Sequence, residues 1–152
     1  ESYCYHNYSK VTRKLSLSRV IKEDNEKVFK QIANFENYSE FIPGCSNAKL
    51  IEKNNEYEIG ELSFNFFLKT YLLRSKNILT ENTIKIEQIK GPFNFFIGQW
   101  SVNQNETSLT DVYFDAEFKL PLILEKITTD DVIESFCDNA FEAFIERLQA
   151  KN

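Results

Sequence analysis

Catalytic and metal-binding residue types are scarce in this chain of 152 residues. It has one histidine, three cysteines and no methionine. The histidine is His6, near the start of the chain, so the rest of the sequence cannot supply a Ser-His or Cys-His catalytic pair. Cys4, Cys45 and Cys137 are odd in number, far apart and without a Cys-x-x-Cys spacing, which disfavours a disulfide framework and a zinc cluster. We expect no catalysis, no metal and no required cofactor.

Excess basic charge, glycine motifs and long apolar runs are also absent. With 18 Lys and Arg against 23 Asp and Glu, the net charge of -5 has the wrong sign for a protein that mainly grips nucleic acid. The four glycines form no GxGxxG fingerprint and no phosphate-binding loop. No run reaches the roughly 20 apolar residues that cross a bilayer. The length then predicts one globular domain with one core.

The first residues differ from the rest of the chain. Because methionine is missing even at position 1, we expect residues 1–10 to be a flexible remnant that follows a removed segment, or a boundary set by cloning. Their Ser, Tyr and basic residues are typical of a transit-peptide remnant. The folded domain is expected over 11–152.

Aromatic residues, in contrast, are abundant. The chain has 14 Phe and 7 Tyr. Each ring brings a large apolar area, and a compact core of this size has no obvious need for so many. The excess favours a lined cavity, with the alternative that the rings fill the interior themselves.

Hydrophobic periodicity divides the chain into strands and helices. A spacing of three and four predicts a helix within 23–35 and a long helix from Asp130, while a short helical turn must end before Pro43. This separation of helices from strands predicts an α+β domain, with a curved antiparallel sheet wrapped around the C-terminal helix. Period-two patterns predict seven strands, near 10–21, 46–53, 56–66, 68–79, 83–90, 93–103 and 109–119.

The strands of this sheet are expected to have one buried face. Val112, Phe114 and Phe118 alternate with polar residues, so the opposite face is wet. One long helix cannot cover the whole concave side, and empty apolar space costs roughly 24 cal/mol per Å³. Either the protein's own rings or a foreign apolar molecule must fill the gap.

Three residues with reactive groups are expected to have structural roles. Cys45 has no neighbouring histidine or basic residue that would stabilise a thiolate. Cys137 lies on the apolar side of the last helix, and both cysteines are expected to pack. Glu61, in a half-apolar strand, is expected to point outward.

Four motifs occur in a fixed order: NYSEFIPGC, GPFNFFIGQW, VYFDAEFKL and AFEAFIERL. In this order and with these gaps, the sequence resembles the coenzyme Q-binding START-domain family, which also contains the bacterial RatA proteins. Two features depart from the family pattern: Gly44 replaces a tryptophan found in many quinone-binding relatives, and FNFFLKTYLL is unusually apolar. The matching positions are Tyr38, Phe41, Ile42, Pro43, Cys45, Gly91, Pro92, Phe93, Gly98, Trp100, Phe114, Phe118, Ala140 and Phe141.

The resemblance implies a START-like helix-grip fold that holds a lipophilic molecule between the sheet and the long helix. The implied function is binding and chaperoning of ubiquinone or its polyprenylated precursors, without turnover, in support of respiration and quinone biosynthesis. That function implies the matrix side of the mitochondrial inner membrane. The alternative is a RatA-like protein of the bacterial cytoplasm that binds the large ribosomal subunit and blocks subunit association. A local cluster of Arg13, Lys14 and Arg19 favours this alternative, and a cyclase-like reaction lacks an acid–base pair.

The ligand-lining side chains are expected to come from the sheet and the last helix. Tyr71 and Tyr38 are the candidates to bond a quinone carbonyl. The predicted lining is Phe41, Pro43, Tyr71, Trp100, Phe114, Phe118, Ile133, Phe136, Ala140 and Phe144.

The segment 91–100 is apolar on both sides of its predicted strand. Phe96 and Trp100 are expected to form part of the cavity wall, while Phe93, Phe95 and Ile97 share the opposite face. Because exposed apolar patches mark partners, we expect Phe93 and Phe95 to contact a membrane. The alternative is plain packing at the edge of the sheet.

Overall fold

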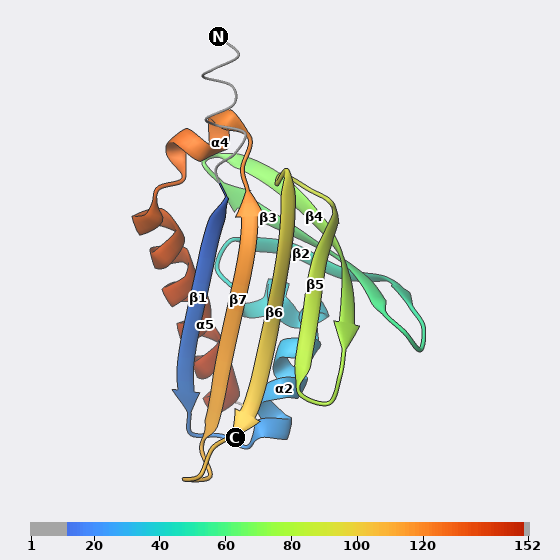
Figure 1. The fold of residues 1–152 in the computed structure, drawn as a ribbon, viewed down its shortest axis with the longest axis vertical. Coiled ribbons are helices and arrows are strands. Elements are labelled where there is room, and N and C mark those ends of the chain that lie inside the picture. Colours follow the sequence, from blue (N-terminus) through green and yellow to red (C-terminus); the bar gives the residue numbers. More distant parts are fainter. Residues whose placement is uncertain (1–11, 151–152) are drawn as a thin grey trace.

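The structure, a computed structural model, describes residues 12–150. The expected remnant 1–10, with Cys4 and His6, lies outside the described residues. Seven strands form one antiparallel sheet in the order β1-β7-β6-β5-β4-β3-β2 (Figure 1). The strands are β1 Arg13–Ile21, β2 Cys45–Lys53, β3 Glu58–Phe66, β4 Lys69–Leu79, β5 Thr83–Lys90, β6 Phe95–Gln104 and β7 Thr110–Lys119.

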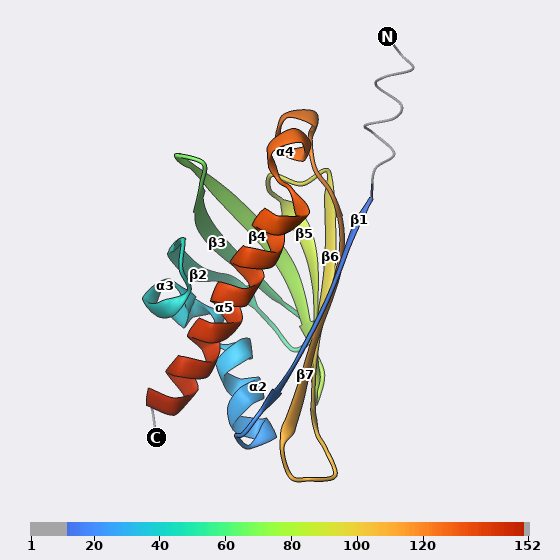
Figure 2. The ribbon, with the colours of Figure 1, turned by 90° about the vertical axis from the view of Figure 1, so that its left-hand side faces the viewer.

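The long helix α5 crosses the concave side of the sheet, with the smaller helices α2 and α3 beside its C-terminal half (Figure 2). The expected curved seven-stranded sheet, short helices and long C-terminal helix are therefore confirmed. Between β7 and α5 the chain forms the separate helix α4. The helices are α2 Asn25–Ala33, the 3-10 helix η1 Phe35–Asn37, α3 Tyr38–Phe41, α4 Leu122–Ile127 and α5 Asp130–Ala150.

Local sequence signals explain where the helices begin. The Asp24 carboxylate accepts hydrogen bonds from the backbone N–H groups of Glu26 and Lys27, at 3.1 and 3.4 Å, and so caps α2. The Thr129 hydroxyl accepts the N–H of Val132 at 3.2 Å, immediately before the regular part of α5. Both caps satisfy backbone donors that a helix start leaves without partners.

The two halves of α5 differ in burial. Phe141, Phe144 and Leu148 in the C-terminal half are buried, while no residue of 130–140 is. We call the region around 141–148 the filled end and the region around 130–140 the open end. The buried cluster at the filled end contains Ile21, Val28, Ile32, Ile42, Cys45, Ile84, Val102, Val112, Phe141, Phe144 and Leu148.

Glu61 forms an ion-pair cluster on the outer face of the sheet. Arg74 donates to its carboxylate through Nε and a terminal nitrogen, at 3.0 and 2.6 Å, and Lys49 Nζ lies 3.4 Å away. The Glu61 side chain points outward as expected, but the cationic side chains cover it, so it is buried. The hydrogen bonds and charge of Arg74, aided by Lys49, lower the pKa of Glu61 although burial opposes this.

Acid is expected to remove the contribution of this cluster to stability. A folded-state pKa below the unfolded value of about 4.3 means that the ionised carboxylate stabilises the fold above that pH. The contribution is lost as the pH falls through the folded-state pKa. Glu61→Gln should therefore be less stable than the parent near neutral pH, with a smaller difference in acid.

Urea unfolding across this pH range measures the effect, and Glu117→Gln provides an exposed control on the same face. Parallel pH profiles for the parent and Glu61→Gln would contradict the assignment.

Candidate ligand-binding site

Aromatic side chains from the sheet and from α5 meet on the concave side at the open end. Phe64 lies opposite Tyr71 in the β3–β4 register. Phe136 of α5 contacts Phe64, with 6.1 Å between the ring centroids. The helix and the sheet therefore present rings to the same space.

The open end is not sealed by these rings. Phe136 is 43% exposed although it contacts the sheet. Leu62, Phe64, Tyr71 and Leu73, which point to the same side, are only half-buried. Covering such apolar area with a ligand would stabilise a complex by roughly 25 cal/mol per Å².

The filled end, in contrast, has almost no free volume. The cavity there measures about 10 Å³ and is lined by residues that include Val28 and Phe141, which is roughly the minimum space for one water. The Phe144 ring lies 5.3 Å from that of Tyr38 and 5.2 Å from that of Phe41, measured between centroids. The filled end therefore leaves no room for a ligand.

An open groove of about 740 Å³ lies between β1 and the start of α5. This volume is in the range of small-molecule pockets, roughly 300–1,000 Å³. Leu15, Leu17, Phe118 and Ile133 supply its apolar lining, while its other lining residues, such as Glu134, are polar or charged. The hydroxyl of Thr128, also in the lining, is buried and has no hydrogen-bond partner among residues 12–150.

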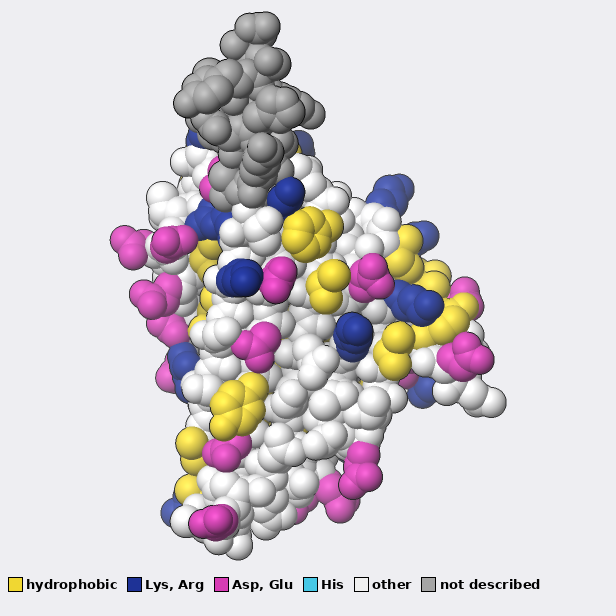
Figure 3. Space-filling view, in the orientation of Figure 1, with side chains coloured by type: hydrophobic (Ala, Val, Ile, Leu, Met, Phe, Trp, Pro, Cys, Tyr) yellow, Lys and Arg dark blue, Asp and Glu magenta, His cyan; other side chains and the backbone are white. Residues whose placement is uncertain are grey.

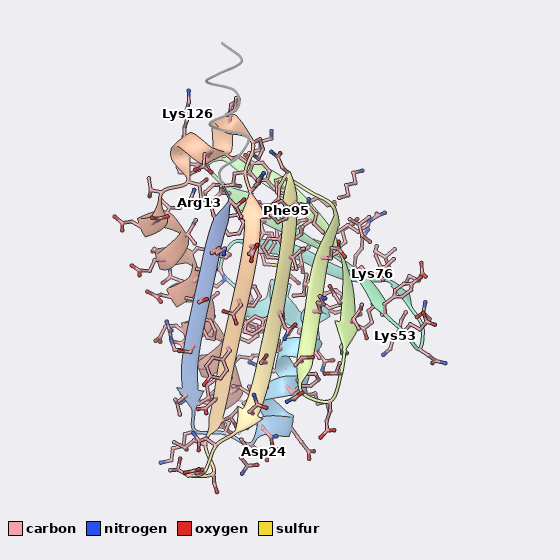
Figure 4. The ribbon with its side chains drawn as sticks, in the orientation of Figure 1. Arg13, Asp24, Lys53, Lys76, Phe95 and Lys126 are labelled. Atoms are coloured by element: carbon pink, nitrogen blue, oxygen red, sulfur yellow. The ribbon has the colours of Figure 1, made fainter. Side chains whose placement is uncertain are left out.

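Arg13 of β1 bonds the α4–α5 segment at one end of the groove. Its guanidinium donates to the Thr128 carbonyl at 2.6 Å and to Asp130 at 2.8 Å, and it lies 3.5 Å from Glu125. These contacts join β1 to α4 and to the start of α5 (Figure 4). Arg13 is therefore engaged within the chain, and so is Arg19, which pairs with Asp138 at 2.7 Å.

Two polar side chains that the sequence did not single out lie within the concave face. Ser75 and Asn77 of β4 are buried, and the Ser75 hydroxyl bonds the Asn77 amide oxygen at 2.8 Å. Whichever way the amide is turned, one of its two polar atoms remains without a partner among the described residues. Asn77 lies between Glu58 of β3 and the half-buried Ile86 of β5 in the strand registers, so the amide can offer a hydrogen bond on the inner face of the sheet. Period-two counting places both on the inner face, but polarity made them look like solvent positions.

The structure brings several predicted lining residues together and separates others. Phe41, Phe144 and Ala140 belong to the packing of the filled end, and Pro43 is exposed in the turn after α3. Their role in binding stays a prediction. The predicted residues at the open end or along the groove are Tyr71, Phe114, Phe118, Ile133 and Phe136. Trp100, also predicted, lies against the filled end, where it lines the small cavity and contacts Phe141 and Phe144.

Of the two candidate tyrosines, Tyr38 already has a partner. Its hydroxyl donates to the Ile32 carbonyl at 2.5 Å, and burial raises its pKa above the ordinary range. Tyr71 lies at the open end, with the Lys69 ammonium 5.3 Å from its ring centroid. Tyr71 is therefore the better placed of the two for a ligand.

Phe93 and Phe95 do not share a face, contrary to the expectation. The Phe93 ring lies 5.0 Å from that of Phe96 and 5.4 Å from that of Phe118, within the inner cluster. Because β6 begins only at Phe95, strand alternation does not extend to position 93. The Gln88 side chain holds the bend, since it donates to the Phe93 carbonyl at 2.9 Å and accepts its N–H at 3.2 Å. Membrane contact by Phe95, on the outer face (Figure 4), stays a prediction.

The site offers packing and hydrogen bonds rather than reactive groups. Burial raises the pKa of the Cys45 and Cys137 thiols, which disfavours the nucleophilic thiolate. Within residues 12–150, no cluster of His, Cys, Asp and Glu could hold a metal ion. None of the described helices is both long enough and apolar enough to span a bilayer.

Comparisons with known proteins agree with this architecture. The ribosome association toxin RatA of Rickettsia prowazekii is 28% identical over 116 residues, which cover 72% of this chain and 79% of that protein. RatA of Escherichia coli is 20% identical over 140 residues, which cover 91% of this chain and 89% of that protein.

Two solved structures have the same fold. The Zhui aromatase/cyclase from Streptomyces sp. R1128 superimposes with a TM-score of 0.80 at 14% identity, over 91% of this chain and 94% of that chain. A START superfamily protein from Mycobacterium smegmatis also has a TM-score of 0.80, at 13% identity, over 91% of this chain and 99% of that chain. The family model described as polyketide cyclase / dehydrase and lipid transport matches residues 21–139. The chain therefore belongs to this START-like family, as its four motifs predicted.

Proposed function

We propose that this protein binds a long apolar ligand at the open end without turning it over, and that the ligand is a polyprenylated quinone or its precursor. The observation that carries the proposal is the half-buried aromatic lining between the sheet and Phe136. An isoprenoid tail would cover these rings and gain transfer free energy for each CH₂ buried. Ser75 and Asn77 carry no charge, so they offer hydrogen bonds to a ligand rather than proton transfer.

A second candidate function is association with the large ribosomal subunit, as the names of the RatA relatives suggest. The acidic net charge does not favour binding to ribosomal RNA. Arg13 and Arg19 of the basic cluster pair with acidic residues of the chain, which leaves Lys14 as its exposed member. The bacterial relatives favour a bacterial cytoplasm for this function, whereas the carrier function fits the mitochondrial inner membrane.

Extraction of the purified protein with organic solvent, followed by mass spectrometry, separates the two functions. A polyprenyl quinone in near-stoichiometric amount is expected for the carrier. Absence of such a lipid, together with co-sedimentation with large ribosomal subunits that weakens with salt, would instead support the ribosomal function.

The Asn77 amide is expected to select for a ligand with a carbonyl group. Asn77→Leu removes the spare polar atom, so affinity for a polyprenyl quinone should fall about tenfold, the worth of one hydrogen bond of roughly 1.4 kcal/mol. Affinity for a polyprenyl hydrocarbon of the same length should change little. The fluorescence of Trp100 provides the titration signal. An equal loss of affinity for both ligands would show that the amide does not bond the head group.

A further inference from the structure

The hairpin between β3 and β4 has an unusual turn. Its two central residues, Phe67 and Leu68, have φ of 50° and 63°. Two-residue hairpins of this kind normally use Asn-Gly, because a side chain at positive φ crowds the backbone. A bulky L-residue is therefore strained in this left-handed conformation. The chain thus has two large apolar residues where small polar ones would stabilise the fold.

These two side chains are also turned into solvent. Phe67 is 55% exposed, and Leu68 is fully exposed. Phe67 packs only sideways on Phe66, with 4.5 Å between ring centroids. The tip therefore gains little burial in compensation for its backbone strain, which points to an external partner.

A second apolar projection lies at the same end of the molecule. Helix α4 exposes Leu122, Ile123 and Ile127, and Ile123 is 77% exposed. Figure 2 shows the β3–β4 tip and α4 at the same end, with α4 directly above the start of α5 and the tip to its left. They therefore flank the open end of the binding site.

The charges around these projections fit an anionic surface. Lys69 directly follows the tip, Lys119 ends β7, and Lys126 extends from α4 at this end (Figure 4). The nearby carboxylates of Glu125 and Asp130 pair with Arg13, although the Asp130 side chain is 97% exposed. Asp131 and Glu134, in the first turns of α5, are also exposed, so the lysines are favourable where they adjoin the apolar projections. Large apolar side chains flanked by lysines are typical of segments that enter the headgroup region of a bilayer.

We propose that the β3–β4 tip and α4 form a bilayer-docking surface, through which the open end faces the membrane. This rests on the proposed lipid-binding function. Two separate convex projections suit a deformable lipid surface, since a rigid protein partner would need a matching pair of pockets. The surface differs from the sequence-based expectation, which placed the contact at Phe93 and Phe95, although Phe95 lies toward the same end (Figure 4). On the outer face of the sheet, hydrophobic side chains are scattered among charged ones (Figure 3).

The double variant Phe67→Asn/Leu68→Gly tests the proposal. It installs the preferred turn, so the thermal unfolding temperature should rise, while affinity for phosphatidylcholine–phosphatidylglycerol vesicles should fall on the order of ten- to a hundredfold. Val20→Ser, which removes an apolar side chain of 61% exposure from the outer face at the other end of β1, is the matched control and should leave vesicle binding unchanged. Ile123→Ser should weaken binding independently.

The outcomes separate docking from ligand binding. Loss of vesicle binding in a more stable variant that retains its extracted lipid supports the docking surface. Vesicle affinity equal to that of the parent would overturn it. A parent protein that docks on vesicles through the tip but contains and takes up no lipid would support docking and contradict the carrier function instead. Stronger binding to vesicles with phosphatidylglycerol than to pure phosphatidylcholine would support an electrostatic contribution of the lysines to docking.

Discussion

Replacement of Phe144 by alanine is expected to lower the free energy of unfolding by about 3–5 kcal/mol. The ring is 6% exposed and contacts those of Tyr38, Phe41 and Trp100, at 5.3, 5.2 and 5.9 Å between centroids. The filled end has no spare volume, so its packed neighbours could close the resulting cavity only partially. Urea unfolding followed by circular dichroism measures the loss.

Phe136→Ala, on the same helix, provides the matched comparison. Because this ring is 43% exposed, its removal should cost about 1 kcal/mol or less, in proportion to the smaller area buried. It should, however, weaken binding of the apolar ligand, since the ring forms the helix side of the open end. Similar stability losses for the two variants would contradict the division of α5 into filled and open halves.

Gly60→Ala is expected to destabilise the fold by about 1–3 kcal/mol through overpacking. A Cβ at this position of β3 would lie 2.3 Å from Phe35 Cζ and 2.5 Å from Cε2. Phe35 is buried in η1, so its ring can move away only by disturbing the packing of the helices on the sheet. Thermal and urea unfolding report the cost.

A double-mutant cycle identifies the clash as the cause. In a Phe35→Leu background, which removes the ring, Gly60→Ala should cost at least about 1 kcal/mol less than in the parent. An unchanged cost would show that the glycine is needed for another reason, such as backbone conformation.

The fold followed from patterns that act locally. Val112 to Phe118 in β7 alternate on one face, and the apolar positions of α5 recur every three or four residues, so periodicity identified both elements before any contact was known. The prediction that Phe93 shares a face with Phe95 was wrong, because the side chain of Gln88, five residues away, sets the bend before β6. Side-chain bonds of this kind leave no periodic signal.

The site was harder to predict, since it depends on which end of an apolar surface remains uncovered. Aromatic residues such as Phe136 and Phe144 are alike in sequence and lie on one helix, yet one is half-exposed and the other is buried. Asn77 was missed for the opposite reason, because a polar side chain in a strand usually faces water. Its burial depends on β5 and β3, which pair with β4 on both sides.

By itself, the sequence determined the class of fold, the family, the single wet face of the sheet and the scarcity of catalytic groups. These properties depend on periodicity, composition and motif order, which are all carried along the chain. Only the tertiary structure decided that α5 is buried in its C-terminal half alone, that Tyr38 bonds Ile32, and that Phe67 and Leu68 project into solvent at positive φ. Those outcomes depend on how distant segments pack, since the burial of a side chain is a property of its neighbours in space.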